Sequence, residues 1–478
     1  MINILWNSCD AAIATGGKNT CNWVASGVSI DTRTLKKGDI FMAIADKRDG
    51  HDYVVEAFKR GAAVAVVSKV PSNLSSEAPL LIVQDVKLAL ASLASFGRRR
   101  FFGKVIAITG SVGKTSTKDM LATTLSDFGK VFKAEKSFNN HLGVPLTLAR
   151  TPPTSDFLVV EIGMSNKKEI APLSELAKPN VALITDVSEA HLASFNNVIE
   201  IAKEKSDICQ GLSREGLCVV SRDSQKYAHL NKYIKRFGVK TVSFGQSKNS
   251  NYKLIKTSIK SNKTCATAVL KNGLEFFFKV NSTGVHHAKN ALGVIAVLDS
   301  LELDITQGLF ALSNWSPTSG RGLITHIRCD DRYLIQDFTI IDETYNANPA
   351  SVIAAFKALV NFSSHADDVL DNSHVRRIAI LGDMLELGPT QNKKHADLAE
   401  KIDFDGIDVV HCVGDLMNCF YKKVPDRKKG KWFRTVKELS SAIANIVKDR
   451  DIIMVKASNG VGLDFFIREL KAMGNLNK

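Results

Sequence analysis

KVIAITGSVGKTSTKDM, residues 104–120, is the stretch that decides the fold. Its first part is an apolar run of strand length, and its polar second part begins a helical pattern. Between them Gly110 and Gly113 allow a sharp turn that brings backbone N–H groups close to an anion. Lys114 can place its charge on the outer phosphates of a nucleotide, and the Thr115 hydroxyl can ligate Mg²⁺.

A strand, a glycine-rich turn and a helix in this order are typical of an ATP-binding phosphate loop. A strict phosphate loop has glycine where Ile108 stands, so the match is to a shorter T-G-S-x-G-K-T-S form. An ordinary strand-to-helix turn would also contain Gly, Ser and Thr, but Gly-Lys-Thr at the junction favours ATP. The predicted ATP-binding residues of the loop are Thr109, Gly110, Ser111, Val112, Gly113, Lys114, Thr115 and Ser116.

Strands and helices alternate on both sides of this loop. The apolar runs FLVVEIG (157–163) and VALITDV (181–187) are followed by helical patterns at 168–177 and 198–212. Such alternation predicts a central parallel sheet of the phosphate-loop ATPase type with helices on both faces. Residues 1–86 contain short strands and a helix, which predicts a small amino-terminal α/β domain.

A second series of strands begins after PTSGRG, residues 317–322, which we interpret as a hinge. Its apolar strands end in polar or glycine-rich residues, which predicts a carboxyl-terminal Rossmann-like, doubly wound domain with ligands at the strand ends. The whole chain is therefore expected to be α/β. A chain of 478 residues suggests roughly three domains. We expect them at residues 1–86, 87–316 and 317–478.

The composition is that of a globular enzyme, with 45% apolar and 23% charged residues. No apolar run reaches the roughly 18 residues of a membrane span, and no signal-peptide pattern opens the chain. Eight cysteines without a metal-binding spacing predict reduced thiols in a cytoplasmic protein.

The net charge of +14 is compatible with nucleic acid, a membrane surface or anionic substrates. The densest basic clusters, at 98–100 and 426–432, are short and lack interleaved aromatic residues at a stacking spacing. A solvated face explains both clusters better than a nucleic-acid site does.

Glu161 ends the strand FLVVE, so its carboxylate is expected at the same sheet edge as the loop. A carboxylate there can hold Mg²⁺, although a glutamate at a strand end is more often only solvated. His191, in EAHLASF, is a weaker candidate because Mg²⁺ prefers oxygen ligands.

Further motifs follow the loop in the order SFNNHLGVPLTL (137–148), EIG (161–163), EAHL (189–192) and AKEKSDI (202–208). In content, order and spacing they resemble the Mur ligases of peptidoglycan synthesis. DETYNANPAS (342–351) and LGDMLELG (381–388) are similar to the member of that family that adds D-alanyl-D-alanine. The resemblance covers nearly the whole chain and is weakest in the first domain and the tail.

The resemblance implies a three-domain ligase that uses ATP and two Mg²⁺ ions. The γ-phosphate would pass to the terminal carboxylate of UDP-N-acetylmuramoyl-tripeptide, and the amine of D-Ala-D-Ala would displace phosphate from the acyl phosphate. The product would be UDP-N-acetylmuramoyl-pentapeptide. Phosphorylation supplies a leaving group, and the developing negative charges require cations around the reacting atoms.

The resemblance gives a catalytic role to Lys114, Glu161, His191 and Lys205. Lys114 would neutralise the transferring phosphoryl group, while Thr115, Glu161 and His191 would ligate metal, with His191 on a second Mg²⁺. Lys205 aligns with a lysine that CO₂ carbamylates in this family, and its carbamate would help to hold a metal. Its position alone is typical of a helix-surface lysine.

The resemblance also assigns residues to the nucleotide and the substrates. Asn290 would contact adenine, and Arg321 would reach the ATP phosphates when the third domain closes. A turn before a helix, capped by Ser351, is the simpler interpretation of YNANPAS. The implied ATP residues outside the loop are Asn290, Arg321, Asp342, Tyr345 and Asn346; the implied substrate residues are Asp31, Thr32, Arg33, Asn139, Asn140, Asn346, Ala347 and Asn348.

Three positions depart from the family pattern. Lys168 stands where glycine is usual, and Asp186 replaces a common asparagine beside the expected metals. The usual Lys-Gly-Ser-Arg run near the carboxyl terminus is Lys456 to Asn459 here, so we give Asn459 no role. The polar segment 361–377 suggests an insertion without a readable function.

Two other kinds of protein share part of these patterns. Another Mur ligase or a folylpolyglutamate synthase would share the loop and the acyl phosphate, but the YNAN and GDMLELG runs argue against both. A phosphate-loop ATPase stimulated by nucleic acid would need a concentrated basic stripe, which the sequence lacks. We therefore expect no nucleic-acid partner, no membrane insertion and a monomer.

Overall fold

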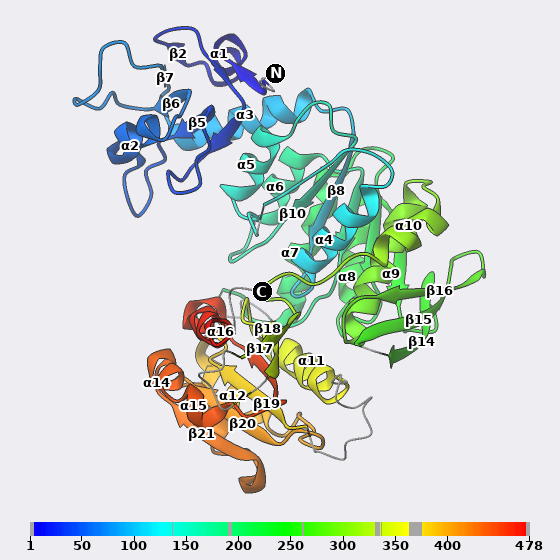
Figure 1. The fold of residues 1–478 in the computed structure, drawn as a ribbon. Helices are drawn as coiled ribbons and strands as arrows, with labels where there is room; N and C mark the ends of the chain where they lie inside the picture. Colours follow the sequence, from blue (N-terminus) through cyan, green and yellow to red (C-terminus); the bar gives the residue numbers. More distant parts are fainter. Residues whose placement is uncertain are drawn as a thin grey trace.

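The computed structural model of the chain describes residues 4–135, 137–189, 194–260, 262–329, 335, 337–362 and 375–474. Three α/β bodies follow one another along the chain, each built around its own sheet (Figure 1). The expected α/β class is confirmed. In the described part of the chain, no helix combines the length and apolar character needed to cross a bilayer.

The first body is a five-stranded sheet in the order β2-β7-β6-β5-β4 with helices around it. β4, β5, β6 and β7 run parallel, and the short edge strand β2 is antiparallel. The strands are β1 (Trp6–Asn7), β2 (Lys18–Asn19), β3 (Val24–Ala25), β4 (Gly27–Ser29), β5 (Asp39–Met42), β6 (Val64–Val67) and β7 (Leu80–Ile82). The helices are α1 (Ser8–Thr15), η1 (Gly50–Tyr53) and α2 (Val54–Lys59).

Helix α3 (Val86–Arg99) joins the first body to the second. It begins at the Asp85 cap, whose side chain accepts a hydrogen bond from the N–H of Leu88 at 2.8 Å. Its residues Leu90 and Leu93 pack in one core with the first sheet and with Leu146 of α5 (Gly143–Arg150). The helix therefore packs against both bodies.

The central sheet has nine strands in the order β16-β15-β14-β13-β12-β11-β8-β10-β9, and β8 to β14 run parallel. These strands are β8 (Lys104–Thr109), β9 (Val131–Lys133), β10 (Phe157–Glu161), β11 (Val181–Ile184), β12 (Leu217–Ser221), β13 (Lys240–Gly245) and β14 (Tyr252–Lys260). The other helices are α4 (Lys114–Leu125), α6 (Ile170–Ala177), α7 (Val198–Ser206), η2 (Asp207–Gly211), α8 (Tyr227–Ile234), η3 (Lys235–Phe237), α9 (Val285–Ser300) and α10 (Ile305–Leu312).

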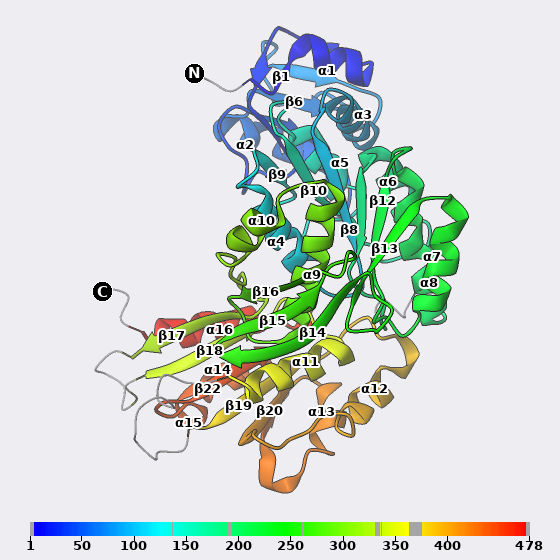
Figure 2. The ribbon, with the colours of Figure 1, turned by 90° about the vertical axis from the view of Figure 1, so that its right-hand side faces the viewer.

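Alternate residues of β8 enter two different cores, as the two-residue period of a strand requires. Ile106 and Ile108 pack with α4 and α9, whereas Val105 and Ala107 pack with the helices α5 to α8. Figure 2 shows α4 and α9 on one side of the sheet and α6, α7 and α8 towards the other. The parallel strands therefore deliver their carboxyl ends to one edge.

An antiparallel extension of the central sheet was not predicted. β15 (Lys263–Val269) and β16 (Glu275–Val280) follow β14 as hairpins, so the expected parallel character applies to β8 to β14. A signal was present, because YKLIKTSIK, KTCATAV and EFFFKV each have strand-like residues and short turns join them. Gly273 supplies a φ of +88° in the second turn.

The third body is a six-stranded sheet in the order β17-β18-β22-β19-β20-β21, with only the edge strand β17 antiparallel in the described residues. Its strands are β17 (Leu323–Arg328), β18 (Asp337–Glu343), β19 (Arg377–Gly382), β20 (Val409–Val413), β21 (Lys429–Phe433) and β22 (Ile452–Lys456). Its helices are α11 (Pro349–Val360), η5 (Gly388–Thr390), α12 (Gln391–Leu398), α13 (Met417–Tyr421), η6 (Asp426–Lys428), α14 (Val436–Ser441), α15 (Ile443–Ile446), η7 (Asn459–Val461) and α16 (Leu463–Ala472).

Helices cover both faces of this third sheet, as the doubly wound prediction requires. α11, α12 and α13 pack on one face, and α14, α15 and α16 pack on the other. The carboxyl ends of β18, β19 and β22 therefore meet at one edge. All eight cysteines are free, as the sequence predicts.

Candidate active site

The phosphate loop closes around its own lysine. Lys114 begins α4 and donates a hydrogen bond from Nζ to the carbonyl oxygen of Gly110 at 2.7 Å. Gly113 has a φ of +81°, and a Cβ there would lie 3.0 Å from the side-chain amide of Asn290. A Cβ on Gly110 would lie 1.9 Å from Oγ1 of Thr185. Both glycines are therefore required by close neighbours. Asn290 stands directly against the loop, and its predicted contact with adenine stays a prediction.

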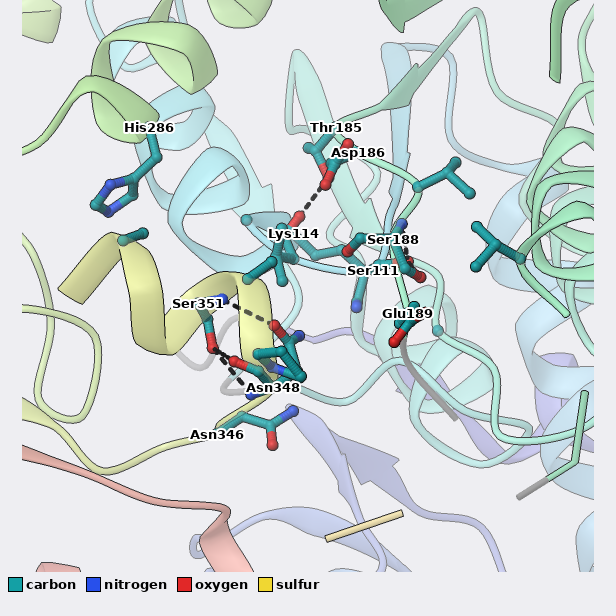
Figure 3. Close-up of a pocket in the computed structure, with 18 of the residues that line it drawn as sticks. Ser111, Lys114, Thr185, Asp186, Ser188, Glu189, His286, Asn346, Asn348 and Ser351 are labelled. Carbon is teal, nitrogen blue, oxygen red and sulfur yellow. Dashed lines mark hydrogen bonds between the residues drawn. The ribbon is translucent and has the colours of Figure 1, made fainter. Parts of the chain in front are cut away.

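The segment after β11 supports the loop from the other side. Ser111 donates from its hydroxyl to the carbonyl of Ser188 at 2.9 Å and accepts from the Ser188 N–H at 3.0 Å. Thr185 donates to the carbonyl of Val112 at 2.6 Å. Figure 3 shows Ser111, Lys114, Thr185 and Ser188 gathered on this side of the cleft. The sequence did not point to Thr185 or Ser188, because their part is to hold backbone.

Glu161 lies where a metal ligand is predicted, at the end of β10 and 1% exposed. Its two carboxylate oxygens accept hydrogen bonds of 2.7 Å, one from the Thr115 hydroxyl and one from the Asn139 amide. A hydroxyl, a carboxylate and an amide oxygen are ligands that Mg²⁺ prefers, so the donor set fits this ion. Lys118, one helical turn beyond Lys114, holds its ammonium 3.7 Å from Glu161.

The predicted ligand of a second metal ion is His191. His191 lies outside the described residues. Among the described residues, which exclude 136 and 190–193, no group of three His, Cys, Asp or Glu side chains could hold a metal ion.

A chain of hydrogen bonds links this cluster to the third body. The Thr115 hydroxyl has one proton and directs it to Glu161, so the Ser137 hydroxyl, 3.2 Å away, donates to the Thr115 oxygen. Ser137 in turn accepts a hydrogen bond of 3.0 Å from Arg321 of the hinge. The guanidinium of Arg321 also lies 3.7 Å from the ring centroid of Tyr345. Ser137 was not predicted, although it lies only two residues before the predicted Asn139.

Buried cations surround the loop. Burial lowers the pKa of Lys114, with Arg321 acting in the same direction and Glu161 opposing it. Lys205, 1% exposed on α7, has a pKa well below its usual value, because of burial first and Lys114 second. Lys205 is therefore no surface lysine, although it does not line the cleft.

Glu204, beside Lys205, holds the backbone at position 168, where the sequence departs from the family pattern. Its carboxylate accepts hydrogen bonds from the N–H groups of Lys168, Glu169 and Ile170 at 2.8, 2.9 and 3.0 Å, and so caps α6. Lys168 holds a φ of +66°, the left-handed region that favours glycine. The other departure, Asp186, is half-buried, and burial raises the pKa of its carboxyl group.

The hinge and the wall of the third body are held from within. Asp342, 1% exposed, accepts hydrogen bonds from the Ser319 hydroxyl at 2.9 Å, the Gly320 N–H at 2.8 Å and the Thr344 hydroxyl at 2.6 Å. These contacts turn the Asp342 carboxylate towards the hinge, and it does not line the cleft. Its predicted place in the ATP site stays a prediction.

The YNAN turn is fixed by two independent devices. Lys456 on β22 donates to the carbonyl of Asn346 at 2.9 Å and to Glu343 at 3.2 Å. Asn348 caps α11 and exchanges hydrogen bonds with Ser351 in a capping box. The predicted turn before a helix is confirmed, but the cap was wrong: the helix begins at Pro349, so Asn348 caps it and Ser351 lies in its first turn. Asn346 and Asn348 also line the cleft (Figure 3).

One cleft of about 1540 Å³ lies between the second and third bodies. Its lining includes these predicted residues: Ser111, Val112, Gly113, Lys114, Thr115, Ser116, Asn139, Asn140, Glu161, Asn290, Arg321, Tyr345, Asn346 and Asn348. The predicted residues that do not line it are Thr109, Gly110, Lys205, Asp342 and Ala347, together with Asp31, Thr32 and Arg33. On the outer wall Lys394 forms an ion pair of 2.5 Å with Glu189, which joins the two bodies.

The first-body candidates lie apart from this cleft. Arg33 binds the carboxylate of Asp31 with two nitrogens, at 2.6 and 3.0 Å, and the Arg33 side chain is 84% exposed. Thr32 is buried. These residues form a surface turn in which Arg33 and Asp31 make an ion pair. Their predicted contact with the substrate stays a prediction. Asn459 is exposed and does not line the cleft.

Comparison with known proteins identifies the family. Residues 108–298 match the Mur ligase middle domain, and residues 328–459 match the Mur ligase, glutamate ligase domain. A UDP-N-acetylmuramoyl-tripeptide–D-alanyl-D-alanine ligase of Rickettsia prowazekii is 32% identical over 96% of this chain and 98% of its own. The enzyme of that name from Bacillus subtilis is 29% identical over 94% and 93%.

Solved structures show the same fold. A crystal structure of MurF from Acinetobacter baumannii has a TM-score of 0.82 at 24% identity and covers 98% of this chain and 99% of its own. MurF ligase from Thermotoga maritima in complex with ADP has a TM-score of 0.76 at 23% identity, with coverage of 94% and 98%. From its matched domains and full-length relatives, the chain belongs to the Mur ligase family and is an enzyme of the ligase class.

Proposed function

We propose that this ligase joins D-alanyl-D-alanine to UDP-N-acetylmuramoyl-tripeptide, with ATP as the energy source, to give the pentapeptide precursor of peptidoglycan. The names of the full-length relatives support this choice of substrates. The structural observation that carries it is the shared cleft, in which the phosphate loop faces Arg321 and Asn346 of the third body. ATP bound on the loop would thus meet groups from the body expected to bind the dipeptide.

Thr115, Glu161 and His191 would hold Mg²⁺, which when bound neutralises charge on the ATP phosphates. Lys114 would leave the Gly110 carbonyl and place its ammonium on the γ-phosphate. Arg321 approaches the same position from the hinge, already oriented by Ser137 and the Tyr345 ring. These residues would stabilise the phosphoryl group as it passes to the carboxylate of the tripeptide.

The second half-reaction is attack by the dipeptide amine on the acyl phosphate. Attack gives a tetrahedral oxyanion, which collapses with loss of phosphate. The turn of Tyr345 to Asn348, held by Lys456, forms the wall beside this position. We propose that this wall orients the amine, since a misplaced nucleophile would lose most of the rate.

Lys205 is proposed to carry the carbamate. Formation of a carbamate requires the neutral amine, and burial and Lys114 both favour that form by lowering the pKa of Lys205. The carbamate anion would then lie among cations. A ¹³C resonance from enriched bicarbonate, present in the wild type and absent from Lys205→Gln, tests this step without turnover.

We further propose domains at residues 1–86, 87–316 and 317–478, a monomer, and residence in the cytoplasm where the nucleotide-linked substrate is made. Asp31, Thr32, Arg33, Asn139 and Asn140 are the proposed contacts for that substrate. The packing of α3 and Leu146 in the first core supports a first domain joined firmly to the second.

Phosphate release from ATP and Mg²⁺, with each substrate omitted in turn, tests the activity. The tripeptide is supplied in forms that end in lysine and in meso-diaminopimelate, and mass spectrometry identifies the product. Release that requires both substrates, with a pentapeptide product, is expected. Release that ignores the dipeptide, or that nucleic acid stimulates, would contradict the proposal.

A further inference from the structure

The antiparallel extension β14–β16 has one packed face and one open face. Leu254, Ala266 and Phe278 of the packed face belong to the same core as α9. The register of the two hairpins places the alternate side chains on the other face. This open face, called the lysine face below, comprises Lys253, Lys256, Ser258, Lys260, Lys263, Cys265, Thr267, Val269, Glu275, Phe277 and Lys279.

The lysine face is strongly and unevenly charged. Five of its side chains are lysines and one is a glutamate. In the described part of the chain none of the five lysines has an ion-pair partner, whereas the nearby Lys271 and Lys289 are paired with Asp299 and Asp223. The face therefore contributes a net charge that nothing in the described structure offsets. It lies at the right-hand edge of the molecule in Figure 1.

An exposed aromatic ring lies on the edge strand of this face. Phe277 is 73% exposed on the edge strand β16. The register aligns it with Thr267 and Lys256, and Lys279 is the next residue of β16 on the same face. Leu274, in the turn before β16, is 60% exposed. Glu275 is the other same-face neighbour of Phe277 on β16, and Lys256 lies two strands away. An exposed ring next to excess positive charge can make apolar and ionic contacts with the same partner.

We infer that the lysine face docks on a bilayer surface rich in anionic phospholipids. Lysine ammonium groups bind the headgroup phosphates, and their long stems allow an adjacent ring to reach the acyl boundary. Phe277 and Leu274 supply that apolar part. Single-stranded nucleic acid would instead need several stacking rings, and the face has one. An acidic protein surface would satisfy the lysines but leave the ring without an apolar partner.

The docking surface is separate from the active site. No residue of β14–β16 lines the cleft of the second and third bodies. Changes on the lysine face are therefore expected to leave turnover in solution unchanged. The inference does not rest on the proposed function, since it uses only the charge, register and exposure of these strands.

Vesicle sedimentation tests the inference on the full chain. The protein is mixed with vesicles of phosphatidylcholine alone and with vesicles in which about a third of the lipid is phosphatidylglycerol. Binding to the anionic vesicles alone, weakened as salt shortens the Debye length below about 10 Å, is expected. No binding, or equal binding to both vesicles, overturns the inference.

Variants locate the binding. Each lysine near an anionic surface is worth roughly fivefold in affinity, so Lys256→Gln with Lys279→Gln is expected to weaken binding about 25-fold. Lys59→Gln with Lys87→Gln removes the same charge from exposed positions of α2 and α3 and is expected to weaken binding less than threefold. Phe277→Ser is expected to weaken it at every salt concentration.

Two further results would overturn the inference. Equal losses in the two double variants would show attraction by net charge alone and would overturn the inference. A single-stranded oligonucleotide could instead bind the protein more tightly than the anionic vesicles do, depend on Lys256 and Lys279, and displace the protein from the vesicles. That result would also overturn the inference. ATPase or ligase turnover equal to wild type, with an unchanged circular dichroism spectrum, verifies that each variant is folded.

Discussion

Removing one hydroxyl should loosen the contact between the metal site and the hinge. In Ser137→Ala the Arg321 guanidinium loses its 3.0 Å acceptor, while the Tyr345 ring remains as its other contact. A hydrogen bond to a charged group contributes about 1.5 to 3 kcal/mol, and water can replace part of it because Ser137 is half-buried. We therefore use the lower value, which corresponds to a loss of roughly tenfold in kcat/KM for ATP.

Phosphate release as a function of ATP concentration measures this loss. Ser137→Thr retains the hydroxyl and should stay within about twofold of wild type. In the background of Arg321→Ala, the further change Ser137→Ala should cost little, because the partner is already absent. Additive effects of the two changes would refute the proposed linkage, as would a Ser137→Ala enzyme with unchanged kinetics.

Three further changes test other parts of the structure. Lys168→Gly should remove the strain of a φ of +66° and raise the free energy of unfolding of the central body, measured in urea, by about 0.5 to 1 kcal/mol. Lys168→Ala should not, because alanine keeps the Cβ that causes the strain. Burial first, and a neighbouring glutamate second, raise the pKa of Asp207 to about 6. The native state then binds the extra proton between about pH 4 and 6, so stability falls as pH rises through that window. Asp207→Asn should abolish this slope and add about 1 to 2 kcal/mol at pH 8, after a discount for solvent screening; urea titrations at several pH values would show a persistent slope if this is wrong. Lys456→Met should raise the KM for the dipeptide roughly tenfold with the KM for ATP unchanged, because the Asn346 carbonyl loses its donor, and equal rises in both constants would contradict this.

The part of the site that follows from local chain order was predictable. Gly110, Gly113 and Lys114 form the turn between a strand and a helix, and Glu161 ends the neighbouring parallel strand. Strand, turn and helix follow from short-range patterns, and the sheet topology then brings the strand ends to one edge. The same reasoning placed Asn346 and Asn348 at an edge of the third sheet.

The contacts made between bodies were not predictable in this way. The contacts of Ser137 with Arg321 and of Lys394 with Glu189 form only when the second and third bodies meet. Asp342 shows a different difficulty, since a strand-end carboxylate can face a ligand or its own backbone, and here it caps the hinge. Lys205 resembled a surface residue because helical periodicity does not reveal which face a neighbouring helix covers.

The hydrogen bonds from Ser319 and Gly320 to Asp342 limit where the second and third bodies can pivot. The chain is anchored to the central core up to Trp315, and Ser319 already binds Asp342 of the third body. The pivot is therefore confined to residues 316–318, and Arg321 lies within about 10 Å of chain from it. In a rotation about this pivot, displacement grows with distance from it. Arg321 therefore moves little, while Lys394 at the outer edge moves much farther. Opening would thus release Glu189 and widen the dipeptide side of the mouth while the corner beside the phosphate loop stays nearly closed.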